Sequence, residues 1–320
     1  MIRRVLIPLD GSELAEQVIP HLLRFVTPER SEFLLMTALP SSLLPIFGDT
    51  IRSFTSEQTA ISNEDEGRVR VAAVAQQLKQ VGFKVESQCL PGKPAESILR
   101  LAEEAYVDLI AMSTHGRTGF ELALLGSVAD EVIRHACSPV FLVPARIVAR
   151  PDPLPHIILL PLDGTPLAET AIPVARQFAQ NTNATIHLIR VVESHDTEEG
   201  LTTSHVSLDL DDIEGQPISQ QAACYLERIQ LQLQLAGITS RRQVAKGDPA
   251  GVIARIAHAE NVDLIVMSTH GRTGVERMVY GSVVSRVINN TVCPLLLMRG
   301  KVSVDACERI ENAVAAGSSC

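Results

Sequence analysis

A loop rich in hydroxyl, imidazole, guanidinium and glycine residues occurs twice in this chain. Its first copy, at residues 113–119, reads Ser-Thr-His-Gly-Arg-Thr-Gly, and the same run returns at residues 268–274. A Gly-Ser pair closes each copy with the same spacing, first as Gly126 and Ser127, then as Gly281 and Ser282. Glycine lets main-chain amides approach a ligand, and a helix start offers unpaired N–H groups with a partial positive charge. The chemistry that this loop favours is phosphate binding.

The closing serines of the two loops, Ser127 and Ser282, can serve in two ways. Each can cap the helix that follows, and each can also donate its hydroxyl to a phosphate oxygen. The two roles are compatible, and we expect both. Neither loop is a Walker loop, because no Gly-Lys-Ser/Thr triplet follows a strand, and neither carries the Gly-x-Gly-x-x-Gly dinucleotide fingerprint.

One aspartate in each half ends a short apolar run and precedes a glycine and a hydroxyl residue: Asp10 and Asp163. In open parallel sheets, ligands bind outside the carboxyl ends of the strands, where neighbouring loops separate. The sequence therefore places Asp10 beside the loop after Met112, and Asp163 beside the loop after Met267. A carboxylate there could also hold a Mg²⁺ ion that bridges phosphates.

The repeated loop also contains a histidine and an arginine in each copy. Imidazole titrates near neutrality and invites a general-base role for His115 and His270, but no nucleophile or metal cluster is linked to either by spacing. We expect these histidines to pack within the loop. Arg117 and Arg272 can pair with phosphate or point to solvent, and the sequence leaves both open.

Two further carboxylates, Asp108 and Asp263, begin apolar strands that lead into the loops. They lie about 16 Å from the loop at roughly 3.3 Å per residue, so we expect structural roles for them. Efficient phosphoryl transfer needs a charge clamp and a positioned nucleophile, which the sequence does not offer. Catalysis is therefore not expected, beyond at most a slow ATPase.

Composition excludes several classes of function. The 320 residues carry a formal net charge of −9, no Trp and only 3 Tyr, which argues against a nucleic-acid partner. No run approaches the roughly 20 apolar residues that span a bilayer, and the apolar run at residues 5–9 is too short for a signal peptide. The 6 Cys show no metal-ligand spacing. We expect a soluble, cytoplasmic protein without a membrane partner.

The elements that must position these residues alternate between apolar strands and amphipathic helices. Continuous apolar strands indicate a parallel sheet covered on both faces, so the sequence predicts an α/β fold: two doubly wound, five-stranded, Rossmann-like domains in tandem. The strand order expected is 2-1-3-4-5 or 3-2-1-4-5. The first helix of each half is expected at 13–25 and 166–179. The expected segments are a domain at 1–145, a proline-rich linker at 146–155, a domain at 156–300 and a tail at 301–320.

The same residues resemble a known family. The Gly-x₉-Gly-Ser spacing that starts at Gly116 and at Gly271, together with the Asp-Gly-hydroxyl turns, looks like a tandem universal stress protein of the ATP-binding kind. The resemblance implies that the aspartate lies at the ribose and adenine, that Ala38 or Val191 packs on the base, and that the Gly-Ser pair holds the phosphates. The ligand implied is ATP, ADP or AMP, with or without Mg²⁺. The nucleotide-binding residues expected are Pro8, Asp10, Ala38, Met112, Ser113, Gly116, Arg117, Gly126 and Ser127, then Pro161, Asp163, Val191, Met267, Ser268, Gly271, Arg272, Gly281 and Ser282.

The sequence departs from the family motif at its first glycine, where Ser113 and Ser268 stand. If the backbone there takes a positive φ, serine costs on the order of 1 kcal/mol and its Cβ crowds a phosphate. If the backbone is ordinary, serine adds a donor. We expect nucleotide binding to be retained, with micromolar affinity for ATP.

Three functions are compatible with these residues. The first is a nucleotide-binding regulatory protein of the stress response, the second a nucleotide-independent scaffold that acts through an unknown protein partner, and the third a slow ATPase. The resemblance also implies antiparallel pairing of the last strands, 140–143 with 295–298, as an internal pseudo-dimer, and further assembly into a homo-oligomer. Two polar segments, 41–67 and 193–220, are expected to be surface loops on the ligand side of the sheet.

Overall fold

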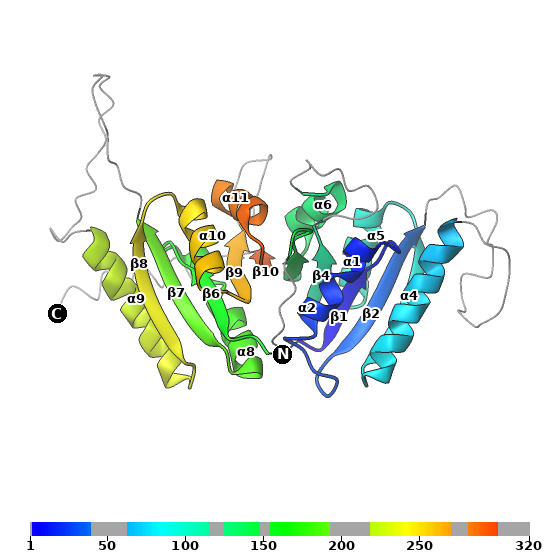
Figure 1. Cartoon of the computed structure of the whole chain (residues 1–320), viewed down its shortest axis with the longest axis horizontal. Coiled ribbons are helices and arrows are strands. Elements are labelled where there is room, and N and C mark those ends of the chain that lie inside the picture. The colour runs from blue at the N-terminus through cyan, green and yellow to red at the C-terminus, as the bar shows by residue number, and fades with distance from the viewer. Residues whose placement is uncertain are drawn as a thin grey trace, which may run out of the picture. The chain divides into compact units, whose positions relative to one another are not determined.

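The computed structural model describes residues 2–39, 63–114, 125–147, 154–192, 218–269 and 281–299. Contacts divide the chain into two compact units. The first is built mainly from residues 1–155 and also contains 291–299, and the second is built mainly from residues 156–271 and also contains 281–290. Figure 1 shows the elements of both units.

The first unit is a parallel sheet with helices on both faces. Its strands are β1 (Arg4–Pro8), β2 (Glu32–Leu39), β3 (Lys84–Pro91), β4 (Leu109–Ser113) and β5 (Val140–Val143), and its helices are α1 (Glu13–Glu16), α2 (Val18–Leu22), α4 (Asn63–Gln80), α5 (Pro94–Glu104) and α6 (Ser127–His135). The strands lie in the order β3-β2-β1-β4-β5, all parallel. The second of the two expected orders is therefore confirmed.

The second unit repeats this plan. Its strands are β6 (Ile157–Pro161), β7 (Thr185–Val192), β8 (Ser240–Lys246) and β9 (Leu264–Thr269), and its helices are α7 (Pro166–Glu169), α8 (Ile172–Thr182), α9 (Ile218–Leu235), α10 (Pro249–Ala259) and α11 (Ser282–Asn290). The strands lie in the order β9-β6-β7-β8, again parallel. The central strands β1 and β6 are apolar and buried in their middle residues, as expected for strands covered on both faces.

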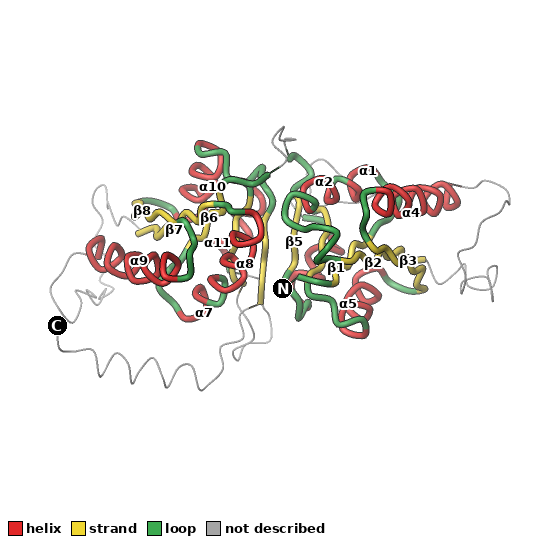
Figure 2. Tube along the Cα trace, turned by 90° about the horizontal axis from the view of Figure 1, so that it is seen from below, coloured by secondary structure: helices red, strands yellow, loops and turns green. Residues whose placement is uncertain are grey.

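Each unit has helices on both faces of its strands. In the first unit, α1, α2 and α4 lie on one face and α5 lies on the other; in the second, α7, α8 and α9 lie on one face and α10 on the other (Figure 2). This two-sided covering confirms the doubly wound α/β class. No helix in the described ranges is long and apolar enough to cross a membrane.

The first helix of each half is not continuous, which corrects the sequence expectation. In place of one helix at 13–25 there are α1 and α2, and in place of one at 166–179 there are α7 and α8. The interruptions lie close to four residues before Pro20 and Pro173. A proline ring clashes with the carbonyl of residue i−4 and its nitrogen cannot donate, so each proline interrupts the helix one turn upstream.

The polar segments are shorter than expected. Helix α4 begins at Asn63 and α9 begins at Ile218, so 63–67 and 218–220 are helical rather than loop. The start of α4 is acidic and lacks apolar periodicity, which hid it in the sequence, although acidic residues suit a helix start. The rest of the two segments lies outside the described residues.

The last strand in the described ranges, β10 (Leu295–Arg299), belongs by its contacts to the first unit. It pairs antiparallel with β5, with Leu295 opposite Leu142 and Leu297 opposite Val140. These side chains are buried. The expected pairing of the two final strands is confirmed at this register.

Candidate functional site

The carboxyl end of β1 is the centre of the candidate site in the first unit. Strand β1 lies between β2 and β4, so the residues that follow these three strands meet at one edge of the sheet. The Leu9 amide donates to the Met36 carbonyl at 2.8 Å, so the hydrogen bonding between β1 and β2 continues one residue beyond the end of β1. Asp10 comes next and therefore stands at this edge.

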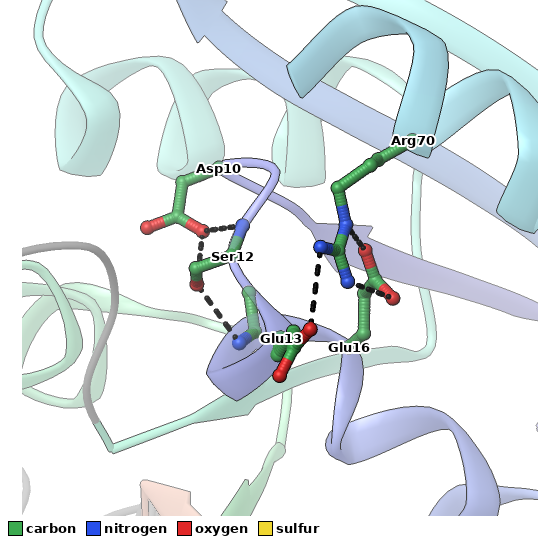
Figure 3. Close-up of polar contacts among 6 residues, drawn as sticks. Asp10, Ser12, Glu13, Glu16 and Arg70 are labelled. Atoms are coloured by element: carbon green, nitrogen blue, oxygen red, sulfur yellow. Dashed lines mark hydrogen bonds and ion pairs between the residues drawn. The ribbon is translucent and has the colours of Figure 1, made fainter. Parts of the chain in front are cut away.

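Asp10 forms a tight turn with the hydroxyl residue that follows it. Its Oδ1 accepts the Ser12 amide at 2.9 Å and the Ser12 hydroxyl at 2.6 Å. Ser12 in turn caps α1, because its Oγ accepts the Ala15 amide at 3.1 Å (Figure 3). Gly11 makes the turn possible with φ of 80°, which side chains with a Cβ rarely adopt. The carboxylate is thus oriented by the chain itself.

The second unit builds the same turn from Asp163. Its Oδ1 accepts the Thr165 amide at 2.8 Å and the Thr165 hydroxyl at 2.6 Å, and Thr165 caps α7 through the Ala168 amide at 3.2 Å. Gly164 has φ of 87°, and a Cβ at this position would meet the guanidinium of Arg190 at 3.1 Å. Glycine is needed here for its conformation, whereas the guanidinium ends a flexible side chain that could move aside.

The Gly-Ser pairs open helices α6 and α11, but serine is not the cap. The Gly126 carbonyl accepts the Asp130 amide at 2.9 Å, and the Gly281 carbonyl accepts the Ser285 amide at 3.1 Å. Gly126 is the N-cap, with an extended backbone and no side-chain cap bond, so Ser127 is the first helical residue. The capping role expected of Ser127 is therefore wrong. Its side chain is exposed at the helix start, and so is that of Ser282.

Ser113 and Ser268 have ordinary backbones. The described non-glycine residues with positive φ are Tyr106, Asn183 and Asn261. Neither serine therefore carries the backbone strain that a positive φ would cause at this position. Each serine lies in the extended backbone of its strand. The Ser268 hydroxyl donates to the Leu167 carbonyl at 2.7 Å and ties β9 to α7.

The residues expected around the adenosine lie near the carboxyl ends of the strands. Ala38 and Val191 are half-buried among the last residues of β2 and β7, whereas Met112 and Met267 are buried. Pro8 and Pro161 end β1 and β6 and are also half-buried. The expected residues Gly116, Arg117, Gly271 and Arg272, and the histidines His115 and His270, lie outside the described residues.

The carboxylates of Asp108 and Asp263 are structural, as expected. Asp108 Oδ2 accepts the Arg3 amide at 2.8 Å and the Arg4 amide at 3.0 Å. Asp263 Oδ2 accepts the amides of His156 at 2.7 Å and Ile157 at 3.0 Å. Each aspartate thus holds the amino end of the central strand, at the edge of the sheet opposite the candidate site.

The sequence reasoning missed the ion pairs that hold α1 to α4. Arg70 forms a bidentate pair with Glu16, at 2.8 and 3.2 Å, and its guanidinium also lies 3.6 Å from Glu13 (Figure 3). Arg228 and Glu169 make the corresponding tie between α9 and α7 at 2.9 Å. No local pattern reveals partners this far apart in the chain.

The second unit also places an aromatic ring near its aspartate. The guanidiniums of Arg190 and Arg228 lie 5.3 and 5.4 Å from the ring centroid of Tyr225, which is cation–π distance. Burial raises the pKa of the Tyr225 hydroxyl, and the Glu169 and Asp163 carboxylates raise it further. Alignment of the two halves could have pointed to this cluster of Tyr225 and two arginines, because Arg190 stands where the first half has the uncharged Thr37.

The chain contains two copies of a doubly wound α/β unit, each with an oriented aspartate and a helix that begins at a Gly-Ser pair. These features place the protein in the class of tandem doubly wound α/β proteins. The family model described as the Universal stress protein family matches residues 1–144 and again residues 155–299. The chain belongs to the universal stress protein family. Within the described ranges, no group of three His, Cys, Asp or Glu side chains could hold a metal ion.

Several known proteins are similar to this chain. Universal stress protein MJ0577 of Methanocaldococcus jannaschii is 32% identical over 157 residues, which covers 45% of this chain and 95% of that protein. Universal stress protein Rv2005c of Mycobacterium tuberculosis is 27% identical over 255 residues, 76% of this chain and 80% of that protein. The crystal structure of a universal stress protein from Archaeoglobus fulgidus matches with a TM-score of 0.63 at 19% identity, over 93% of this chain and 99% of that one. That structure supports the fold.

Proposed function

We propose that this universal stress protein binds an adenine nucleotide, ATP or ADP, in each unit and acts as a nucleotide-dependent regulator of a stress response. The observation that carries the proposal is the oriented carboxylate of Asp10, repeated at Asp163, at the edge of the sheet where the Gly-Ser helix begins. Family membership points the same way.

The described part of the site fits an adenosine phosphate. A carboxylate fixed by its own turn can accept the ribose hydroxyls, and small half-buried side chains such as Ala38 and Val191 leave room for a flat base. The start of α6 offers first-turn N–H groups without intrahelical partners, and Gly126 adds no Cβ beside them. A Mg²⁺ ion would enter with the phosphates rather than on a prebuilt protein cluster. Cytoplasmic location and assembly into homo-oligomers belong to the same proposal.

Calorimetric titration of the whole chain with ATP tests the proposal. We expect about two nucleotides per chain, and Asp10→Ala and Asp163→Ala should each weaken one site about tenfold or more, because a charge-assisted hydrogen bond is lost. Glu13→Ala is the matched control, since Glu13 lies on α1 but is exposed and outside the site.

Mass spectrometry of nucleotide released from the purified protein gives an independent readout, in which adenine nucleotide should appear for the wild type and not for the double aspartate variant. No heat and no thermal shift at millimolar ATP would overturn the proposal and favour the scaffold. Phosphate release above the double-variant background would instead indicate a slow ATPase.

A further inference from the structure

The first unit contains a cavity of about 470 Å³ between α4 and the edge of the sheet at β2 and β3. Val71, Ala75 and Cys89 are buried side chains of its wall, and the exposed Lys79 belongs to the wall as well. It lies on the face covered by α4, and residues of the nucleotide site such as Gly126 and Ser127 are not part of its wall. A volume of this size suits a small organic molecule.

The two halves can be aligned across this region because they share buried positions. Glycines follow α4 and α9 at Gly82 and Gly237, 155 positions apart, and the same shift superimposes the buried positions of the two helices. Val71 then matches Leu226, and Leu78 matches Leu233. The side chains at the cavity wall can therefore be compared with those at the matching positions of the second unit.

In the second unit, the positions that form the cavity wall carry long side chains. Ser87 is replaced by Arg242 and Ala75 by Gln230. The Arg242 guanidinium donates to the Gln230 side-chain carbonyl and, at 3.2 Å, to Glu227, which stands in place of Ala72. The Gln230 amide group donates to a β8 carbonyl at 2.8 Å. These side chains bridge the helix and the edge strand at positions where the first unit has the smaller residues Ala72, Ala75 and Ser87.

The wall of the cavity has a definite chemistry. Its buried side chains are Val71, Ala75 and Cys89, and the neighbouring lining residues Gln76, Ser87 and Gln88 are polar. Among the described residues that line it, Lys79 carries a charge and none is acidic. The Thr37 hydroxyl is buried and has no hydrogen-bond partner among the described residues. Three buried apolar side chains beside one exposed cation suit a ligand with an apolar body and a single negative group.

We propose that this cavity binds a small monocarboxylate with an apolar chain, of the size of octanoate. The chain lies on Val71, Ala75 and Cys89, and the carboxylate pairs with Lys79. The site is specific to the first unit, since the corresponding lysine position in the second unit is Gln234 and the space is spanned by Arg242. It is separate from the proposed nucleotide function, and either can fail alone.

The test uses the full chain and sodium octanoate as the probe. Calorimetry should show one octanoate site per chain, and octanoate should slow alkylation of Cys89, followed peptide by peptide in the mass spectrometer. Alkylation of Cys137 is the internal control, because this thiol is exposed and lies elsewhere.

Two variants that carry residues of the second half distinguish binding in the cavity from binding elsewhere on the chain. Ala75→Gln with Ser87→Arg fills the space with a pair that the fold already accommodates, and should weaken octanoate binding at least tenfold while the thermal melt stays cooperative. Lys79→Gln should weaken octanoate several-fold and leave binding of octanol unchanged. Absence of octanoate binding to the wild type, or equal binding by the filled variant, would overturn the proposal, and so would an equal affinity of the wild type for octanoate and octanol.

Discussion

A single carboxylate oxygen accepts two hydrogen bonds from the hydroxyl residue two positions further on, at Asp10 and again at Asp163. The carboxylate orientation is therefore set before any ligand arrives, which lowers the entropy that binding must offset. Both turns depend on a glycine with positive φ between the two residues. The sequence pattern Asp-Gly-Ser/Thr predicted the residues, but the geometry that fixes them appears only in the fold.

Tyr106 is a residue whose backbone works against stability. It has φ of 49° and is 88% exposed, whereas the second half has Asn261 at this position with φ of 52°. Asparagine tolerates the left-handed region better than an aromatic residue does. We expect Tyr106→Asn to raise the free energy of unfolding by about 1 kcal/mol.

Urea denaturation followed by circular dichroism would measure this change. The reciprocal variant, Asn261→Tyr, should lower the free energy of unfolding by a similar amount. Equal stability of all three proteins would contradict the assignment of strain to Tyr106.

His187 gives the second unit a dependence on pH at a position where the first unit has an apolar residue. The side chain is 2% exposed on β7, and the first half has the buried Leu34 there. Burial lowers the pKa of His187 below its ordinary value, with the nearby Arg241 acting in the same direction and the partner Glu260, 2.8 Å from Nδ1, opposing it; Gln243 also opposes it by hydrogen bonding.

The unfolded chain keeps the ordinary histidine pKa near 6.5, so it takes up a proton at a higher pH than the folded chain does. The contribution of neutral His187 to the free energy of unfolding is then fully present above pH 6.5. It falls as the pH drops through 6.5 toward the pKa of the folded state, by at most about 1.4 kcal/mol per pH unit. His187→Leu should flatten this slope, because Glu260 retains Arg241 as a partner. Urea denaturation at several pH values checks it, with the exposed His258→Gln as the control; an unchanged slope in His187→Leu would refute the role of this histidine.

At the scale of elements, prolines and distant ion pairs decide what the sequence could reveal. Strand positions were predictable because both faces of the sheet are covered and the strands read as apolar runs. The split of the first helix was not, because Pro20 and Pro173 act one turn upstream of themselves and leave the apolar pattern intact. The acidic start of α4 at Asn63 was missed because it lacks an apolar face.

The pair between Arg70 and Glu16 should hold the short helix α1 on α4. A four-residue helix has little stability of its own, so its contacts determine how often it opens. We expect Arg70→Met to speed hydrogen exchange of the Ala15 amide a few-fold, with a smaller effect at high salt because the pair is partly exposed.

Hydrogen exchange with peptide-level mass spectrometry measures this opening. Arg100→Met is the control, since Arg100 and Glu104 are 3.9 Å apart on one exposed helix face. Equal exchange of α1 in both variants would show that α1 is held by its apolar contacts instead.

At the scale of the whole molecule, the duplication predicted the division into two domains. The structural effects of the sequence differences between the two copies could not be predicted. The repeated loop and the shared spacing predicted two units of one kind, which the family matches support. Which side chains fill the space between a helix and an edge strand depends on three-dimensional neighbours. Ser87 and Arg242 are both ordinary polar residues in the sequence, yet one borders a cavity and the other spans the equivalent space.

The contacts of β10 also bear on how the chain acquires its structure during synthesis. The strand is encoded after residue 290 but pairs with β5 of the first unit. At roughly 5–20 residues per second, the ribosome needs on the order of ten to thirty seconds to travel from β5 to β10. During that interval the emerging β5 has one edge without this partner, and such an edge can pair with another nascent chain. Protection of this edge by a chaperone would then matter most while the second half is still being translated.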